Sequence, residues 1–270
     1  MWATEPRMIG HYFKPSLWAD EMCSIRLDPW QREQIDSTAH WQIWNCSRQS
    51  GKSTTAALKA LHTAIHKPGS LSLLLAPSER QSSELFEKVS QFYQQLPRNP
   101  PWHLVGDSTR HLRMVNDSRI VVLPGNPDTV RGYTAELVVL DEAAKCSTDL
   151  YRTIRPMLLV NDGTLILAST PFGKRGFFWD VWRDAKKHAE FERRLITADD
   201  CPRLDQTKLD IERVAQGDWF DQEYMGKFLS VEGGLFTEEQ LEAMSVADSA
   251  GVEDIARPWV PVERMSATSR

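Results

Sequence analysis

Residues 46–54 read Cys-Ser-Arg-Gln-Ser-Gly-Lys-Ser-Thr, and the end of this stretch has the residue types of a phosphate-binding loop. In such a loop backbone N–H groups face the phosphates, a lysine reaches the β and γ oxygens, and a hydroxyl ligates Mg²⁺. An apolar run precedes the stretch and a helical pattern follows it, as such a loop requires. A serine-rich turn before a helix is the alternative. We predict an ATP site formed by Ser47, Arg48, Gln49, Ser50, Gly51, Lys52, Ser53 and Thr54.

Two residues of this stretch depart from the usual pattern. Cys46 occupies a position where glycine is usual, and nothing else in the sequence accounts for it. Arg48 places a guanidinium inside the loop, beside the γ-phosphate, where negative charge develops during hydrolysis. We therefore count Arg48 among the candidate catalytic residues.

Two carboxylates follow the apolar run at 137–140. Asp141 is expected to hold Mg²⁺ together with Ser53, and Glu142 to orient and deprotonate an attacking water. Apolar strands that end in acidic residues are common, so this motif gains its weight from following the loop in the expected order. Its distance from Lys52 along the chain predicts two neighbouring strands of one sheet.

Three further motifs each have a functional and a plain structural interpretation. Ser169 and Thr170 end another apolar run and could sense the γ-phosphate and couple its loss to movement, or they could form a simple turn. The amide of Gln31 could donate to and accept from an adenine edge, or lie in a surface turn. Arg131, next to a glycine, could reach the nucleotide of a neighbouring subunit, or form a surface salt bridge.

The elements that must position these residues alternate along the chain. Apolar strand patterns and helical patterns in turn predict an α/β fold with a parallel sheet, and ligands bind at the carboxyl ends of such strands. Residues 1–35 are aromatic-rich and read as irregular, whereas 177–228 read as mostly helical. The predicted strands are 41–46, 71–76, 137–140 and 165–168, with a hairpin at 112–123 and helices at 52–65 and 78–95.

Composition sets the class of protein. The chain has 270 residues, 41% hydrophobic residues and a net charge of −5, which suits one large globular domain. The four cysteines have no metal-binding or disulfide spacing, and no apolar run is long enough to span a membrane. We expect a cytoplasmic protein without membrane contact.

A basic cluster could follow a DNA backbone, or be a solvated helix face. It comprises Lys174, Arg175, Arg183, Lys186, Lys187, Arg193 and Arg194.

Together these residues resemble the ATPase domain of phage and prophage terminase large subunits. The similarity runs from about Leu27 to Phe236, and its motifs are those around Gln31, Arg48–Ser53, Arg131, Asp141–Ala144, Ser169–Gly173 and Gln222–Phe228. It implies a P-loop NTPase of the RecA-like, ASCE type, with a central, mostly parallel sheet flanked by helices. The ATPase domain would be 1–235, with a core at about 36–175, a small helical lid or linker subdomain at about 1–35 and 176–235, and a tail at 236–270.

The resemblance also implies roles and partners. Arg48 would act in cis as a sensor or finger, Arg131 would be the trans finger across a ring interface, and Ser169 and Thr170 would form the coupling motif. The substrate would be ATP with Mg²⁺, used to translocate double-stranded DNA into a procapsid. The partners would be further copies in a ring, commonly a pentamer, together with a portal protein and a small terminase subunit.

Large terminases usually carry a nuclease domain after the ATPase domain. Such chemistry needs several carboxylates arranged on a second sheet, and too little chain follows Phe236 for that, so DNA cleavage is not expected. Two alternatives stay open. One is a superfamily 2 helicase-like, DNA-dependent ATPase, which would need a second motor domain. The other is a degenerate prophage ATPase that binds the nucleotide without turnover.

Overall fold

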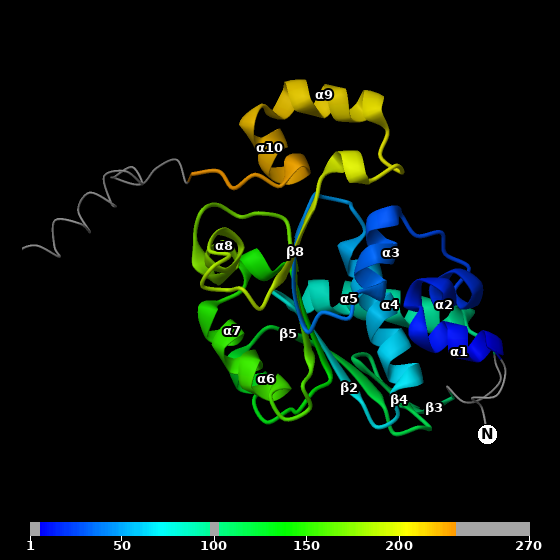
Figure 1. Ribbon diagram of the computed structural model, residues 1–270. Helices are drawn as coiled ribbons and strands as arrows, with labels where there is room; N and C mark the ends of the chain where they lie inside the picture. Colours follow the sequence, from blue (N-terminus) through cyan, green and yellow to red (C-terminus); the bar gives the residue numbers. More distant parts are fainter. Residues whose placement is uncertain (1–5, 98–102, 231–270) are drawn as a thin grey trace, which may run out of the picture. The chain divides into compact units, whose positions relative to one another are not determined.

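The computed structural model describes residues 6–97 and 103–230, and within them it forms one eight-stranded sheet (Figure 1). The strand order is β3-β4-β5-β2-β6-β7-β1-β8. In this order, every neighbouring pair from β5 onward, through β2, β6, β7 and β1 to β8, is parallel. The two remaining pairs, β3 with β4 and β4 with β5, are antiparallel. The strands are β1 Trp41–Cys46, β2 Leu71–Ala76, β3 Leu104–Asp107, β4 His111–Met114, β5 Arg119–Pro124, β6 Leu137–Asp141, β7 Thr164–Ser169 and β8 Glu192–Ile196.

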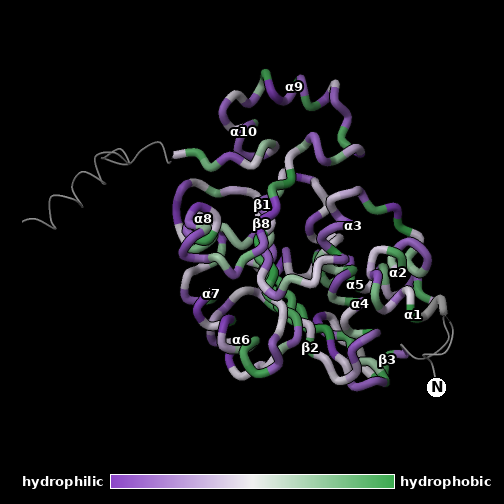
Figure 2. The backbone as a smooth tube through the Cα atoms, viewed as in Figure 1, coloured by the Kyte–Doolittle hydropathy of each residue, from purple (hydrophilic) through white to green (hydrophobic). Residues whose placement is uncertain are grey.

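Helices cover both faces of the sheet, and the alternation of side chains along each strand feeds two hydrophobic clusters. Trp44 faces the cluster with α1–α5, whereas its neighbour Ile43 faces the cluster with α6–α8. Figure 2 shows the hydrophobic residues concentrated along the strands between these layers. The first layer comprises α1 Pro6–Phe13, α2 Pro15–Met22, α3 Pro29–Asp36, α4 Lys52–His66 and α5 Glu79–Gln95. The second comprises α6 Pro127–Val130, η1 Ala143–Lys145, α7 Thr148–Ile154, η2 Arg155–Leu158 and α8 Gly176–Arg183.

The chain after β8 forms η3 Ala198–Asp200, α9 Gln206–Gln216 and α10 Asp218–Met225. The described residues up to Leu229 form one compact unit. The predicted tail at 236–270 lies outside the described residues. In the part of the chain that is described, no helix combines the length and apolar character needed to cross a bilayer.

Three expectations from the sequence need correction. The strands that carry the loop and Asp141 are not neighbours, because β7 lies between β1 and β6 and pairs with both. Spacing along the chain fixes the order of strands in sequence but not in the sheet. The region 177–228 is not simply helical, since Glu192–Ile196 forms β8 beside β1. At the sheet edge its charged residues stay accessible, which hid the strand pattern.

The described part of the region predicted as irregular, residues 6–35, is not irregular either. Three helices lie there, and each has proline at its start, a position that favours proline because its fixed φ suits a helix. The side chains of Trp18 and Trp30 are 1% exposed and lie in the same cluster as α4. This region therefore packs against the layer that positions the loop.

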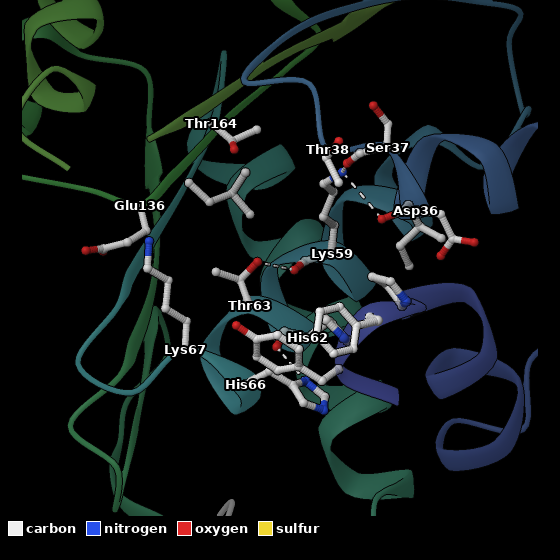
Figure 3. A pocket seen from close by; sticks show the side chains of 15 residues that line it. Asp36, Ser37, Thr38, Lys59, His62, Thr63, His66, Lys67, Glu136 and Thr164 are labelled. Carbon is white, nitrogen blue, oxygen red and sulfur yellow. Dashed lines mark hydrogen bonds between the residues drawn. The ribbon is translucent and has the colours of Figure 1, made fainter. Parts of the chain in front are cut away.

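A buried lysine anchors the end of α3. Lys59 on α4 donates hydrogen bonds to the carbonyls of Gln34 at 3.0 Å and Ser37 at 2.8 Å. These carbonyls end a helix and have no partner within it. Burial lowers the pKa of Lys59 to about 8. Figure 3 shows its side chain reaching from α4 toward Ser37 along the wall of a hollow.

We expect Lys59→Met to lower the free energy of unfolding by about 2 kcal/mol, because it leaves buried carbonyls without a donor. Urea denaturation measures this, and Lys67→Met, at an exposed site of the same hollow, is the control. Between pH values of about 8 and 10.5 the unfolded chain binds more protons than the folded one, so wild-type stability should rise with pH there and the Met variant should lack this rise. Equal losses in the two variants would contradict the anchoring role.

Candidate active site

The predicted loop connects the end of β1 to the start of α4. Gly51 has φ +96° and ψ 19°, in the left-handed region that favours glycine. A Cβ atom on Gly51 would lie 2.8 Å from Nε2 of Gln31 and 3.0 Å from Nη2 of Arg203, so a side chain here would displace the ends of these two residues. The loop thus leads directly into the first turn of α4, whose free N–H groups suit an anion.

A lysine and two carboxylates lie together at this edge of the sheet. Lys52 Nζ is 2.7 Å from Oε1 of Glu142, and Lys145 Nζ is 3.0 Å from Oε2 of the same carboxylate. Burial works against the charge on Lys52, but Asp141 and Glu142 outweigh it and raise its pKa. Burial likewise works against ionisation of Glu142, yet the two lysines hold its pKa below the ordinary value. The pair is therefore ionised at neutral pH.

Ser53 and Asp141 form the predicted metal-binding pair. Ser53 Oγ donates to Oδ2 of Asp141 at 2.6 Å, and Oδ1 accepts from the N–H of Glu142 at 3.0 Å. Burial raises the pKa of Asp141, against the lowering effects of Lys52 and Ser53. A hydroxyl and a carboxylate in contact are hard oxygen donors, the kind that Mg²⁺ prefers. In the described ranges no group of three or more His, Cys, Asp or Glu could hold a metal, so phosphate and water oxygens would have to complete the shell.

The end of β7 lies between these two strands. Asn45 of β1 is the register partner of Ser169, and Asp141 of β6 is the partner of Ala168. Ser169 is fully buried, and its Oγ donates to the carbonyl of Thr170 at 2.7 Å. The predicted coupling residues therefore lie at the same sheet edge as the loop and Asp141, as the sequence requires.

Arg48 is exposed and lies beside α10. Its side-chain Nε is 3.4 Å from Oε2 of Glu223, and its backbone N–H donates to the backbone carbonyl of Glu223 at 2.6 Å. The backbone N–H of Ser47 donates to the carbonyl of Ile196 at 2.6 Å, and the side chain of Ser47 is fully buried. The backbone donors at the start of the loop are thus already engaged, so the phosphate-facing donors must come from its later residues.

The other loop residues differ in exposure. Gln49 is exposed and has φ +57°. Ser50 is buried, whereas Thr54 is half-buried on the first turn of α4. Cys46 is fully buried in the cluster beneath α4, and burial raises the pKa of its thiol to about 12. The cysteine in place of glycine therefore acts as an inert apolar residue.

The amide of Gln31 faces the protein. Its Oε1 accepts from the N–H of Asp28 at 2.9 Å, and its Nε2 donates to the carbonyl of Gly51 at 3.3 Å and to Oγ1 of Thr55 at 3.0 Å. The side chain is 3% exposed. It holds the loop from below, and reading of an adenine edge would require these bonds to be exchanged.

Two contacts at the site were not predicted from the sequence. Arg203, which lies in none of the motifs, donates from Nη2 to the carbonyl of Ser50 at 2.7 Å. Glu223 belongs to the motif at Gln222–Phe228, but its pairing with Arg48 was not predicted. Arg131 is 67% exposed and 3.3 Å from Oδ1 of Asp128, and in the described residues no hydrogen bond or ion pair joins it to the loop.

A hollow of about 340 Å³ lies at the opposite ends of the strands, near the starts of β6 and β7 (Figure 3). Its buried polar groups already have partners, since Lys59 caps α3 and Nε2 of His62 lies 2.9 Å from the carbonyl of His11. Burial lowers the pKa of His62 to about 3, so the ring is neutral. The chemistry of the chain is thus concentrated at the loop rather than in this hollow.

Comparisons with known proteins agree with the geometry. The chain matches a family model described as terminase large subunit, T4likevirus-type, N-terminal, over residues 43–243. The large terminase subunit of Thermus phage G20c is 29% identical over 234 residues, covering 74% of this chain and 48% of that protein. The probable large terminase subunit of Enterobacteria phage P7 is 21% identical, covering 75% of this chain and 46% of that protein. This chain spans about half the length of these relatives.

Solved structures give the same result for the fold. The Thermus phage P74-26 large terminase ATPase domain has a TM-score of 0.68 at 27% identity, covering 80% of this chain and 99% of that one. A large terminase from a thermophilic bacteriophage, solved in complex with ATP-gamma-S, has a TM-score of 0.62 at 13% identity, covering 76% of this chain and 53% of that one. The predicted fold, a RecA-like P-loop domain with a mostly parallel sheet, is confirmed.

Proposed function

Because this chain belongs to the T4likevirus-type terminase large subunit family, matched through its N-terminal part, we propose that it is the ATP-hydrolysing motor of a DNA-packaging terminase. One observation carries the proposal. Lys52 contacts Glu142 while its neighbour Ser53 contacts Asp141, so the proposed phosphate-binding loop meets the proposed metal ligand and the proposed base at one sheet edge. The large terminase of the thermophilic bacteriophage, similar in fold, has been solved with ATP-gamma-S.

In this proposal each group of residues at the site has a separate role in ATP hydrolysis. The N–H groups at the start of α4 and the ammonium of Lys52 would bind the phosphates. Ser53 and Asp141 would hold Mg²⁺, which supplies charge neutralisation at the phosphate oxygens when bound. Glu142, kept ionised by its two lysines, would orient the attacking water.

A triphosphate would also change the partners within the site. Its oxygens compete with Glu142 for Lys52, which would free one carboxylate oxygen to face the water. Glu142 has φ +52°, an uncommon left-handed conformation for a residue other than glycine. Such a backbone fixes the direction of the carboxylate at the end of β6. Arg48 would act in cis once it leaves Glu223, its partner in the structure.

DNA, ring formation, a portal protein and a small terminase subunit are further parts of the proposal. Two residues of the basic cluster, Arg193 and Arg194, are engaged by contacts within the protein and are therefore less available to DNA than the sequence indicates. Arg193 donates to the carbonyls of Val181 at 2.8 Å and His188 at 3.0 Å, and Arg194 lies 2.9 Å from Oε2 of Glu33. We therefore narrow the DNA-contacting candidates to the exposed members of the cluster, Arg175, Arg183, Lys186 and Lys187.

We expect Glu142→Gln to reduce ATP turnover by at least about 100-fold, because the amide cannot accept a proton from water. Nucleotide binding should persist, since Lys52 and the loop remain. Phosphate release and binding of a fluorescent ATP analogue measure the two effects separately. Glu84→Gln, at an exposed site paired with Arg80, is the control. Unchanged turnover in Glu142→Gln would place the catalytic base elsewhere.

We expect Arg131→Ala to reduce turnover only at protein concentrations where the chain assembles. Its guanidinium is exposed within one chain, as a finger acting on a neighbouring subunit must be. Turnover per subunit measured across a dilution series, with sedimentation to follow assembly, tests this. Arg152→Ala is the control, because Arg152 is also exposed and pairs with an acidic residue three positions earlier. An equal loss in a proven monomer would refute a role in trans.

A further inference from the structure

An arginine outside every predicted motif holds the backbone of the phosphate-binding loop. We propose that Arg203 is a positioning residue that aims the N–H of Gly51 at the nucleotide phosphates and so sets nucleotide affinity. The inference rests on the proposed function, because it concerns the same loop. It adds a residue that lies in none of the motifs by which the chain was interpreted.

The guanidinium of Arg203 is held on two sides. Its Nη2 donates to the carbonyl of Ser50 at 2.7 Å, and its Nε donates to Oδ2 of Asp28 at 2.9 Å. The carboxylate of Asp28 is only 7% exposed, while the side chain of Arg203 is half-exposed. Charge-assisted bonds to a fixed carboxylate give the planar guanidinium a defined orientation. Asp28 therefore determines where the donor to Ser50 points.

The geometry of the peptide bond connects this contact to the phosphates. In a trans peptide the C=O and the N–H point in opposite directions. Fixing the carbonyl of Ser50 toward Arg203 therefore turns the N–H of Gly51 to the other side. The next peptide is held in the same way, because the carbonyl of Gly51 accepts from the N–H of Thr55 at 3.0 Å and from Nε2 of Gln31 at 3.3 Å, which turns the N–H of Lys52 to the other side. Two successive donors are aimed before any ligand arrives.

Arg203 comes from the segment at 197–205, between β8 and α9. The residue that ends β8, Ile196, accepts the N–H of Ser47 at the start of the loop. Both ends of the loop are thus held by the same stretch of chain. Nucleotide affinity should depend on that stretch staying in place, which links the region after β8 to the phosphates through a single side chain.

The mechanism predicts which kinetic constant changes. The N–H groups of such a loop face phosphates that ADP and ATP share. Losing their alignment removes binding that is equal in the ground state and the transition state, so KM should rise while kcat holds. A side chain that touched the γ-phosphate directly would instead affect ATP alone and lower kcat.

The test compares the affinities of fluorescently labelled ADP and of ATP-gamma-S for wild type, Arg203→Ala and Arg203→Lys. We expect Arg203→Ala to weaken both by about 10-fold, the scale of one lost hydrogen bond to a charged group, with kcat within about 2-fold. Arg203→Lys should recover part of the loss, because an ammonium can still donate to Ser50. Arg113→Ala is the control, since Arg113 is similarly exposed and pairs with Asp117 on the hairpin.

Equal affinity in wild type and Arg203→Ala would overturn the inference. So would a loss confined to ATP-gamma-S with a lower kcat, which would mean a direct phosphate contact. Failure of the wild type to bind either nucleotide would instead refute the proposed function. If Arg203→Ala does not fold, Asp28→Asn keeps a residue suited to the start of α3 and removes the charge that orients the guanidinium. It should weaken both nucleotides in the same direction, and unchanged binding would again overturn the inference.

Discussion

Three buried ionisable side chains share the carboxyl edge of the sheet, and the rest of the structure must keep them compatible. Lys52, Asp141 and Glu142 are largely buried, and burial alone would favour the neutral form of each. They stay compatible because Lys52 opposes both carboxylates and Lys145 adds a second cation on Glu142. Removing one partner from such a set leaves an uncompensated buried charge, which is strongly destabilising. The same balance leaves the site ready to exchange Glu142 for phosphate oxygens.

The sheet makes this arrangement possible. Parallel strands end at one edge, so β1, β7 and β6 deliver the loop, Ser169 and Asp141 side by side although they are far apart in sequence. Cys46 and Trp44 pack beneath the loop against α4. Above the sheet edge, Ile196, Arg203 and Glu223 hold the loop from the chain after β8. The loop is therefore fixed on its outer side and keeps its later N–H groups for a ligand.

Local patterns in the sequence predicted the motifs but not the contacts between them. Gly51, Lys52, Ser53, Asp141 and Glu142 stand in continuous strand–loop patterns, and the structure brings them together as expected. The position of β7 between β1 and β6 could not be predicted, because spacing does not encode strand order. β8 was missed since its charged residues sit at a sheet edge, where polar side chains cost little. The contacts that Arg203 and Glu223 make with the loop were missed because long-range hydrogen bonds and ion pairs leave no periodic trace in the sequence.

Gln31 shows that a residue can have more than the roles its chemistry indicates. Its amide could contact an adenine edge or lie in a surface turn, whereas in the structure it bonds to Asp28, Gly51 and Thr55. Together with Arg203, it turns the region around α3 into a support for the loop. Gln31 and Arg203 thus hold two successive peptides of the loop from different parts of the fold.

The most direct measurement is phosphate release from ATP by the purified chain with Mg²⁺, with and without double-stranded DNA, across protein concentration. The account predicts Mg²⁺-dependent turnover that rises with concentration and with DNA, because the charges at the sheet edge form a hydrolytic site and the motor acts on DNA as an assembly. No release above the buffer background under any of these conditions would contradict it.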